Sequence, residues 1–245
     1  VQDLEYDKHW ILDSFRLRIV SELMNHPLFV PDYVLASGSE VRKCRRLDDY
    51  FVFTCKEITD RKIVPEGFDL HSLEGLVQEI YAKTQKHLDR AFAKLTFEEI
   101  DSLIYTAPSL WSDEADSLAR GYAGALHKEF GVERDTGYTL DLVSLLQIAK
   151  KVDVAELHIA GATLARGIEL VAGMASALGN AESLPSQTIN GVTGTVHCVY
   201  VLPGNNRCVV GGRGPNIYSG DFAFIIDLGG NDVYEGRAAG AVGRY

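Results

Sequence analysis

Two stretches near the C-terminal end overlay when the chain is shifted by 16 positions, placing residues 208–220 on residues 224–236. Both stretches carry two β-branched residues, a glycine-rich corner, an Asn or Asp, an Ile or Val, a Tyr and a closing Gly. Each copy predicts a strand, a corner, a second short strand and another corner. Such a unit buries little by itself and needs neighbours stacked on it, which indicates the start of a β-solenoid. The alternative is two strands of an ordinary antiparallel sheet with similar turns.

The composition changes near residue 190. The last 55 residues hold 12 of the 23 glycines and no lysine, and β-branched and aromatic runs alternate there with turn residues. Earlier apolar residues recur at helical spacing, as from Leu73 to Leu95. We therefore expect an α+β fold, with a mainly helical domain over residues 1–185 followed by a Gly-rich β segment over 186–245. Within the first domain, residues 27–68 are expected to be irregular or mixed.

Several helices have recognisable ends. Thr96 to Glu99 is a capping box that opens a helix, and Asp153 to Glu156 resembles another. Tyr50 to Thr54 is a short β-like run. After Asp153, apolar and small residues step alternately by three and four, which predicts a central, buried helix with a heptad seam and glycines that let neighbours approach closely. The seam consists of Val154, Leu157, Gly161, Leu164, Ile168, Val171, Ala175 and Leu178, and the glycines are Gly161, Gly167 and Gly173.

The charge balance narrows the partners. With 34 acidic and 24 basic residues, the formal net charge is −10, so the surface repels polyanions and nucleic acid is not expected to bind. The best candidate membrane span, residues 159–178, carries Arg166 and Glu169 near its centre, so no membrane span is expected. The basic cluster of Arg42, Lys43, Arg45 and Arg46 either holds an acidic partner or forms a solvated face paired with Asp48 and Asp49.

The four cysteines show no metal-binding or redox spacing. Cys44, Cys55, Cys198 and Cys208 include no CxxC pair. Residues 203–206 predict a hairpin turn whose register puts Val201 opposite Cys208 and Cys198 opposite Gly211, too far out of step for a disulfide between Cys198 and Cys208. Reduced core cysteines, or bridges to Cys44 or Cys55, remain open.

Catalytic patterns are absent from the sequence. There is no HExxH motif, no Gly-x-Ser-x-Gly elbow and no cysteine with flanking residues that would lower its pKa. His158 is expected to be a partly buried, hydrogen-bonded histidine, and His197 has no nameable partner. Gly211 to Gly214 precedes Pro215 rather than a helix, so a corner is expected there and not a phosphate loop.

The closing repeat resembles known families. Residues 230–236, GNDVYEG, are similar to half of the calcium-binding glycine- and aspartate-rich repeats of secreted bacterial toxins and proteases, although no tandem array is present. The string from Ile225 to Tyr234 also resembles the DLGGDDVY-type repeats of large secreted bacterial proteins, some of which carry a helical N-terminal region. The resemblance covers about 40 residues and implies an extracellular or periplasmic location.

Calcium is the cofactor that these residues suggest. Asp227, Asn231, Asp232 and Glu235, together with corner carbonyl groups, offer the oxygen ligands that Ca²⁺ prefers. The preceding copy has Gly211, Pro215 and Asn216 in the places of Asp227, Asn231 and Asp232, so a site shared between the copies would be underfilled. Alternatively, the same side chains make Asx turns that satisfy the amide groups of the corner.

Two functions follow from these observations. The first is a non-catalytic secreted or envelope-type assembly or binding protein that pairs with itself or with a partner chain at the C-terminal β edge, because an open rung exposes unpaired backbone groups. The second is the N-terminal portion of a larger secreted hydrolase, such as a peptidase, with catalytic residues beyond Tyr245 or in the helical domain. Such catalysis within this chain would need a cleft that holds His158, His197 and a carboxylate.

Overall fold

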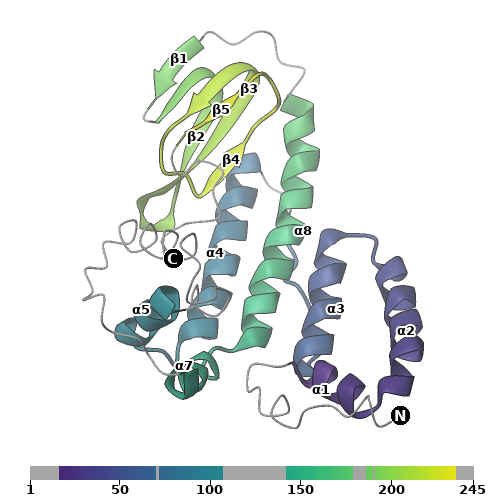
Figure 1. The fold of residues 1–245 in the computed structure, drawn as a ribbon. Helices are drawn as coiled ribbons and strands as arrows, with labels where there is room; N and C mark the ends of the chain where they lie inside the picture. Colours follow the sequence, from purple (N-terminus) through teal and green to yellow (C-terminus); the bar gives the residue numbers. More distant parts are fainter. Residues whose placement is uncertain (1–16, 70–71, 107–141, 179–185, 190, 236–245) are drawn as a thin grey trace. The chain divides into compact units, whose positions relative to one another are not determined.

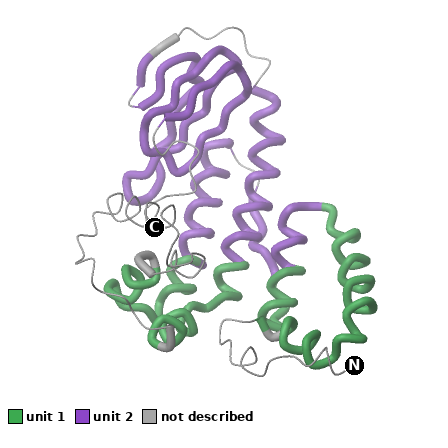
Figure 2. Tube along the Cα trace, viewed as in Figure 1, with its two compact units in different colours: residues 1–45, 53–63, 88–158 green, residues 46–52, 64–87, 159–245 purple. Residues whose placement is uncertain are grey.

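The computed structural model describes residues 17–69, 72–106, 142–178, 186–189 and 191–235. The chain forms two compact units (Figure 2). Unit 1 comprises residues 1–45, 53–63 and 88–158, and unit 2 comprises residues 46–52, 64–87 and 159–245. The expected boundary at residue 185 does not separate them, because three helices contribute residues to both units.

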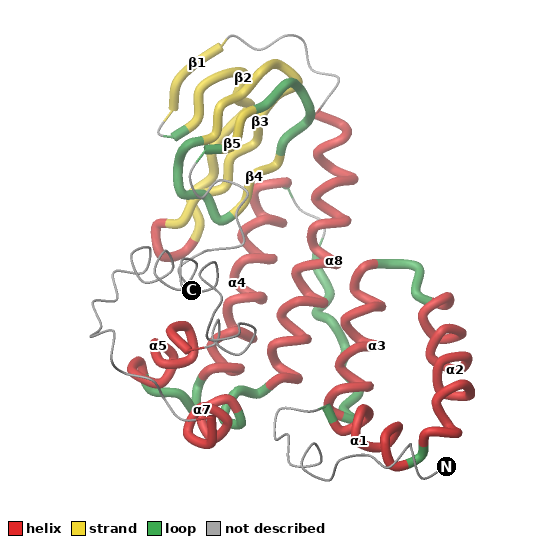
Figure 3. Tube along the Cα trace, viewed as in Figure 1, coloured by secondary structure: helices red, strands yellow, loops and turns green. Residues whose placement is uncertain are grey.

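The helices precede the strands in the chain (Figures 1 and 3). This arrangement confirms the α+β class, with a helical region followed by a mixed sheet. The helical elements are α1 (Arg18–Asn25), η3 (Pro27–Phe29), α2 (Val30–Lys43), α3 (Leu47–Thr59), α4 (Leu73–Phe92), α5 (Phe97–Thr106), α7 (Leu142–Ala149), α8 (Val154–Leu178) and η5 (Pro203–Asn205). The strands are β1 (Ser186–Ile189), β2 (Val192–Leu202), β3 (Asn206–Tyr218), β4 (Phe224–Ile226) and β5 (Val233–Tyr234).

Side-chain caps begin two helices of unit 1. The capping box of α5 is confirmed, because Glu99 N–H donates to Thr96 Oγ1 at 3.3 Å and Thr96 N–H donates to Glu99 Oε2 at 3.1 Å. Asp153 Oδ1 accepts the N–H groups of Ala155 and Glu156 at the start of α8, at 3.1 and 3.2 Å. Each cap satisfies backbone donors that a helix leaves unpaired in its first turn.

Residues 30–59 are mostly helical, in contrast to the irregular segment with a β-like run that their sequence suggested. The run from Tyr50 to Thr54 lies inside α3. Arg46 N–H donates to Asp49 Oδ2 at 3.0 Å, and Leu47 N–H donates to Glu169 Oε1 at 2.9 Å. These carboxylates suit the positive end of a helix, so the cap and its tertiary partner override the β propensity of the aromatic and β-branched residues.

The sheet of unit 2 has the order β1-β2-β3-β4, and β5 also pairs with β3. Strands β1, β2 and β3 are antiparallel neighbours. The turn between β2 and β3 has three residues instead of the expected four, so Leu202 pairs with Asn206 and Cys198 faces Val210. The predicted register, with Cys198 opposite Gly211, was therefore wrong. Cys198 and Cys208 are free, as are Cys44 and Cys55.

Apolar residues fill both faces of the sheet. On one face, α4 and α8 supply side chains to a cluster with Leu202, Cys208 and Val210. Four residues of α4 belong to this cluster, Leu73, Leu76, Val77 and Ile80, which confirms the helical stripe read from the sequence. On the other face, β2 and β3 enclose a second cluster, consisting of Val192, Val196, Val209 and Tyr218. Burying both faces makes this sheet the hydrophobic centre of unit 2.

Helix α8 buries small residues rather than the predicted heptad seam. Ala162 and Ala165 are buried, whereas Ile168 of the seam is 45 % exposed. The expectation of close neighbours is met at Gly161 and Gly167, where an added β-carbon would lie 2.5 Å from the ring of Phe51 and from Ile80, respectively. None of the helices in the described part of the chain is long and apolar enough to cross a membrane, in line with the charges in α8.

Candidate functional site

Two short strands lie alongside β3 in parallel, at a constant offset. Residues 208–210 of β3 pair with residues 224–226 of β4, and residues 217–218 pair with residues 233–234 of β5. Every pair in both ladders is 16 residues apart, the same shift at which the sequence overlays on itself. The two stretches thus lie side by side in unit 2, strand on strand (Figure 1). A third copy, expected to begin near Gly240, lies outside the described residues.

The tyrosines of the two stretches stack. The rings of Tyr218 and Tyr234 have centroids 5.1 Å apart and are inclined by 16°. Tyr218 is fully buried, while Tyr234 is 45 % exposed. The stack therefore has an inner ring packed within the sheet and an outer ring whose other face is accessible.

Each tyrosine hydroxyl approaches the residue seven positions before it. Tyr234 Oη donates to Asp227 Oδ2 at 2.5 Å, and this hydrogen bond, followed by burial, raises the pKa of Tyr234 to about 12. In the inner stretch, position 211 is Gly, and a β-carbon built on it would lie 1.8 Å from Tyr218 Oη. The inner hydroxyl fills the space that a side chain would need, which explains why Gly stands where the outer stretch has Asp.

A corner residue links the two stretches. Asn216 is 1 % exposed, and its side-chain amide donates to the carbonyl oxygens of Gly212 and Gly214 at 3.2 and 2.8 Å. Its backbone N–H donates to Asp232 Oδ1 at 2.9 Å. Asp232 occupies the same place one stretch later, so the acidic side chain of one corner satisfies the amide of the corner before it.

The four predicted calcium ligands differ in their surroundings. Asp227 accepts from Gly229 N–H at 2.9 Å, the geometry of an Asx turn, and also from Tyr234. Asp232 accepts from Asn216. Asn231 and Glu235 are exposed. Within the described ranges, no group of three or more His, Cys, Asp and Glu residues is placed to hold a metal ion. Two of the four side chains thus already serve the corner, as the alternative interpretation expected.

The outer side of β4 and β5 presents backbone groups away from β3. Ala223 N–H donates to Arg207 O and Glu235 N–H donates to Tyr218 O, both at 2.8 Å. Because backbone direction alternates along a strand, the N–H and C=O groups of Phe224, Ile226 and Tyr234 point to the opposite side. No other strand of the described chain pairs with that side. We call this side, formed by Phe224–Ile226 and Val233–Tyr234, the outer edge.

A buried ion-pair network elsewhere in unit 2 was missed as a unit by the sequence analysis. Asp48 is 1 % exposed, and its Oδ2 accepts from Arg166 Nη2 and Nε at 2.7 and 2.8 Å. Arg46 Nε lies 3.1 Å from Asp48 Oδ1 and 2.9 Å from Glu169 Oε2. Arg166 and Glu169 were noticed only as charges within an apolar helix. That signal pointed to buried partners but could not name them.

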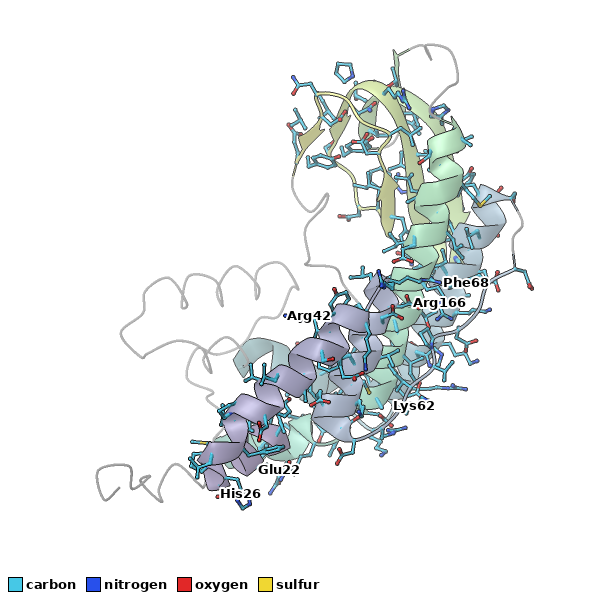
Figure 4. The ribbon with its side chains drawn as sticks, turned by 90° about the vertical axis from the view of Figure 1, so that its right-hand side faces the viewer. Glu22, His26, Arg42, Lys62, Phe68 and Arg166 are labelled. Carbon is cyan, nitrogen blue, oxygen red and sulfur yellow. The ribbon has the colours of Figure 1, made fainter. Side chains whose placement is uncertain are left out.

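The same arginine holds an extended segment between α3 and α4. Arg166 Nη1 donates to the carbonyl oxygen of Pro65 at 3.2 Å, and Thr163 Oγ1 accepts from Glu66 N–H at 3.1 Å. Figure 4 shows Arg166 beside the chain that leads to Phe68. His87 Nε2 donates to Glu66 Oε1 at 3.1 Å, and this hydrogen bond holds the pKa of Glu66 below its ordinary value, against the effect of burial. The balanced charges and backbone partners make this network a structural clamp.

The remaining reactive side chains are held in unreactive states. Burial raises the pKa of the Cys208 thiol to about 12 and raises that of Cys198 as well. His158 Nδ1 lies 2.7 Å from Val154 O in its own helix, which confirms that it is partly buried and hydrogen-bonded. His158 belongs to unit 1 and His197, in β2, belongs to unit 2. Neither thiol is a thiolate near neutral pH, so neither is activated as a nucleophile.

Comparison of the chain with protein-family models, with characterised proteins and with solved structures finds no significant match.

Proposed function

We propose that this chain is a non-catalytic assembly or binding protein that adds a β-strand to its outer edge. The observation that carries the proposal is the pair of parallel ladders at an offset of 16 residues, which ends on the outward-pointing backbone groups of β4 and β5. An exposed row of backbone donors and acceptors is a template for another strand. A stacked unit of this kind also gains stability from each neighbour added to it.

The chemistry of the described residues supports binding over catalysis. The thiols of Cys198 and Cys208 have raised pKa values, and the buried carboxylate of Asp48 is held by two arginines. A hydrolase with catalytic residues beyond Tyr245 or in the helical domain was the other prediction. No group of residues in the described ranges favours it, and it is not developed into a mechanism.

Calcium and the extracellular or periplasmic location remain predictions attached to this proposal. If Ca²⁺ binds at Asp227, Asn231, Asp232 and Glu235, thermal unfolding will move to higher temperature with added calcium and back with a chelator, because a ligand of the native state stabilises it. Superimposable melting curves under both conditions would remove calcium from the proposal and leave edge binding intact.

Edge binding is tested first with the protein as its own partner. Sedimentation velocity over a wide concentration range should reveal association that Val233→Lys weakens, because a lysine on an edge strand opposes strand pairing. Val201→Lys is the matched control, since Val201 is 61 % exposed on β2 and lies away from the outer edge, whereas Val233 is 47 % exposed on β5. Equal loss of association in both variants would contradict the proposal, as would a protein that neither associates nor binds any strand-forming peptide.

A further inference from the structure

The contacts between the two stacked stretches describe what the outer edge can accept. Two interactions cross from one stretch to the next beyond the strand pairing itself. Asn216 N–H donates to the side chain of Asp232 at 2.9 Å, and the ring of Tyr218 stacks on that of Tyr234 at 5.1 Å. Both depend on the residue type at the matching position of the following stretch.

The outermost stretch repeats the donor half of each interaction. Asp232 stands 16 residues after Asn216, so its backbone N–H points toward the position that a following stretch would occupy. The ring of Tyr234 is 45 % exposed on the side away from Tyr218. An incoming segment would complete these groups with an Asn or Asp oxygen at one position and an aromatic ring two residues later.

We infer that the outer edge binds a polypeptide segment that runs parallel to β4 and β5 and carries an Asx–β–Tyr triplet. This triplet is present in the chain as Asn216-Ile217-Tyr218 and as Asp232-Val233-Tyr234, in each case beginning eight residues after the first residue of the preceding strand. The inference rests on the proposed function and deepens it, because it names the chemistry of the partner. Parallel strand bonds provide affinity, and the Asx and Tyr side chains provide register.

A second folded copy of the chain does not meet these requirements. The inner side of β3 already pairs with β2, so a folded copy offers only β1 or its own outer edge. Strand β1 reads Ser-Gln-Thr-Ile and has no Asx–β–Tyr triplet. Two outer edges related by a twofold axis would run antiparallel and could not place Tyr over Tyr in the observed register. The occupant is therefore an unpaired segment of polypeptide.

The probe that tests this inference is a synthetic peptide of residues 222–235, FAFIIDLGGNDVYE, labelled with a fluorophore and added to the whole protein. Fluorescence anisotropy measures its affinity. The peptide variants Asp232→Ala and Tyr234→Leu should each bind about tenfold more weakly, the effect of losing one good interaction. A photoreactive group at the first residue of the peptide reports orientation, because a parallel segment places it near Phe222 and an antiparallel one places it near Glu235.

The outcomes separate this inference from the proposed function. Cross-linking near Phe222 together with tenfold weaker binding of both peptide variants supports the inference. Equal binding of the three peptides, or cross-linking near Glu235, overturns it while edge binding stands. Saturable binding that Val233→Lys in the protein does not weaken overturns both, as does the absence of any binding and any self-association.

Discussion

The contact between Gly211 and Tyr218 can be tested by a double-mutant cycle. In Gly211→Ala, the new methyl group would lie 1.8 Å from Tyr218 Oη and 3.1 Å from Cζ. Tyr218 is fully buried and stacked on Tyr234, so its ring has no free direction in which to move. Gly211 has no positive φ, so alanine meets no backbone strain there. The whole penalty should come from the clash with the hydroxyl.

The magnitude follows from two opposing effects. Inserting a methyl group into a packed site costs about 1–3 kcal/mol. Replacing Gly by Ala at a compatible backbone position restores about 0.4–1 kcal/mol by restricting the unfolded chain. Because the contact is far inside van der Waals distance, the cost lies at the upper end, and the net loss in the free energy of unfolding is about 2 kcal/mol.

Removing the hydroxyl should rescue the variant. Tyr218 Oη is buried without a hydrogen-bond partner among the described residues, so Tyr218→Phe alone should change stability by less than about 1 kcal/mol. In the double variant the nearest atom is the ring carbon at 3.1 Å, which needs a shift of only a few tenths of an ångström. The two substitutions should therefore couple by about 2 kcal/mol, within the range for residues in contact.

Urea denaturation followed by circular dichroism measures all four proteins of the cycle. The midpoints should move while the slopes stay constant, which shows that stability and not the extent of unfolding has changed. Two results would refute the reasoning. One is a Gly211→Ala protein as stable as the original, and the other is a double variant no more stable than Gly211→Ala alone. Either would mean that the tyrosine does not lie over position 211.

Three further predictions concern the helices and the clamp of unit 2. Gly167→Ala should be less stable than Gly173→Ala by about 1–3 kcal/mol, because both gain helix propensity but only position 167 lacks space for a methyl group; equal urea midpoints would contradict this. Asp48→Asn should lose about 3 kcal/mol of unfolding free energy, since it leaves a partly buried arginine without its counter-charge; a calorimetric midpoint unchanged from the original would count against the clamp. The lowered pKa of Glu66 means that its contribution to stability is present above its ordinary pKa near 4.5 and is lost as the pH falls through the lowered value. Glu66→Gln should therefore be less stable than the original protein at pH 7, and the gap should narrow in acid; a gap independent of pH would refute it.

The corner residues show how far a repeat in the sequence can be carried. The shift of 16 residues paired 208–210 with 224–226 in advance, and the structure has those residues side by side in parallel. The contrast between Gly211 and Asp227 was visible in the sequence, but its cause was not. It arises because Tyr218 folds back across seven residues to fill the space above Gly211, a contact that exists only once the strand has bent.

Local chemistry was sufficient for the elements whose partners are close in sequence. The capping box at Thr96, the start of α8 at Asp153, the stripe along α4 and the division into helices followed by strands could all be predicted, because each depends on neighbours within a turn or a corner. Features that depend on distant residues could not. The run from Tyr50 to Thr54 became helical under a cap supplied by Glu169, and Asp48 found Arg166 118 residues away. Tertiary structure decided these, because burial and ion pairing outweigh the weaker preferences of a single segment.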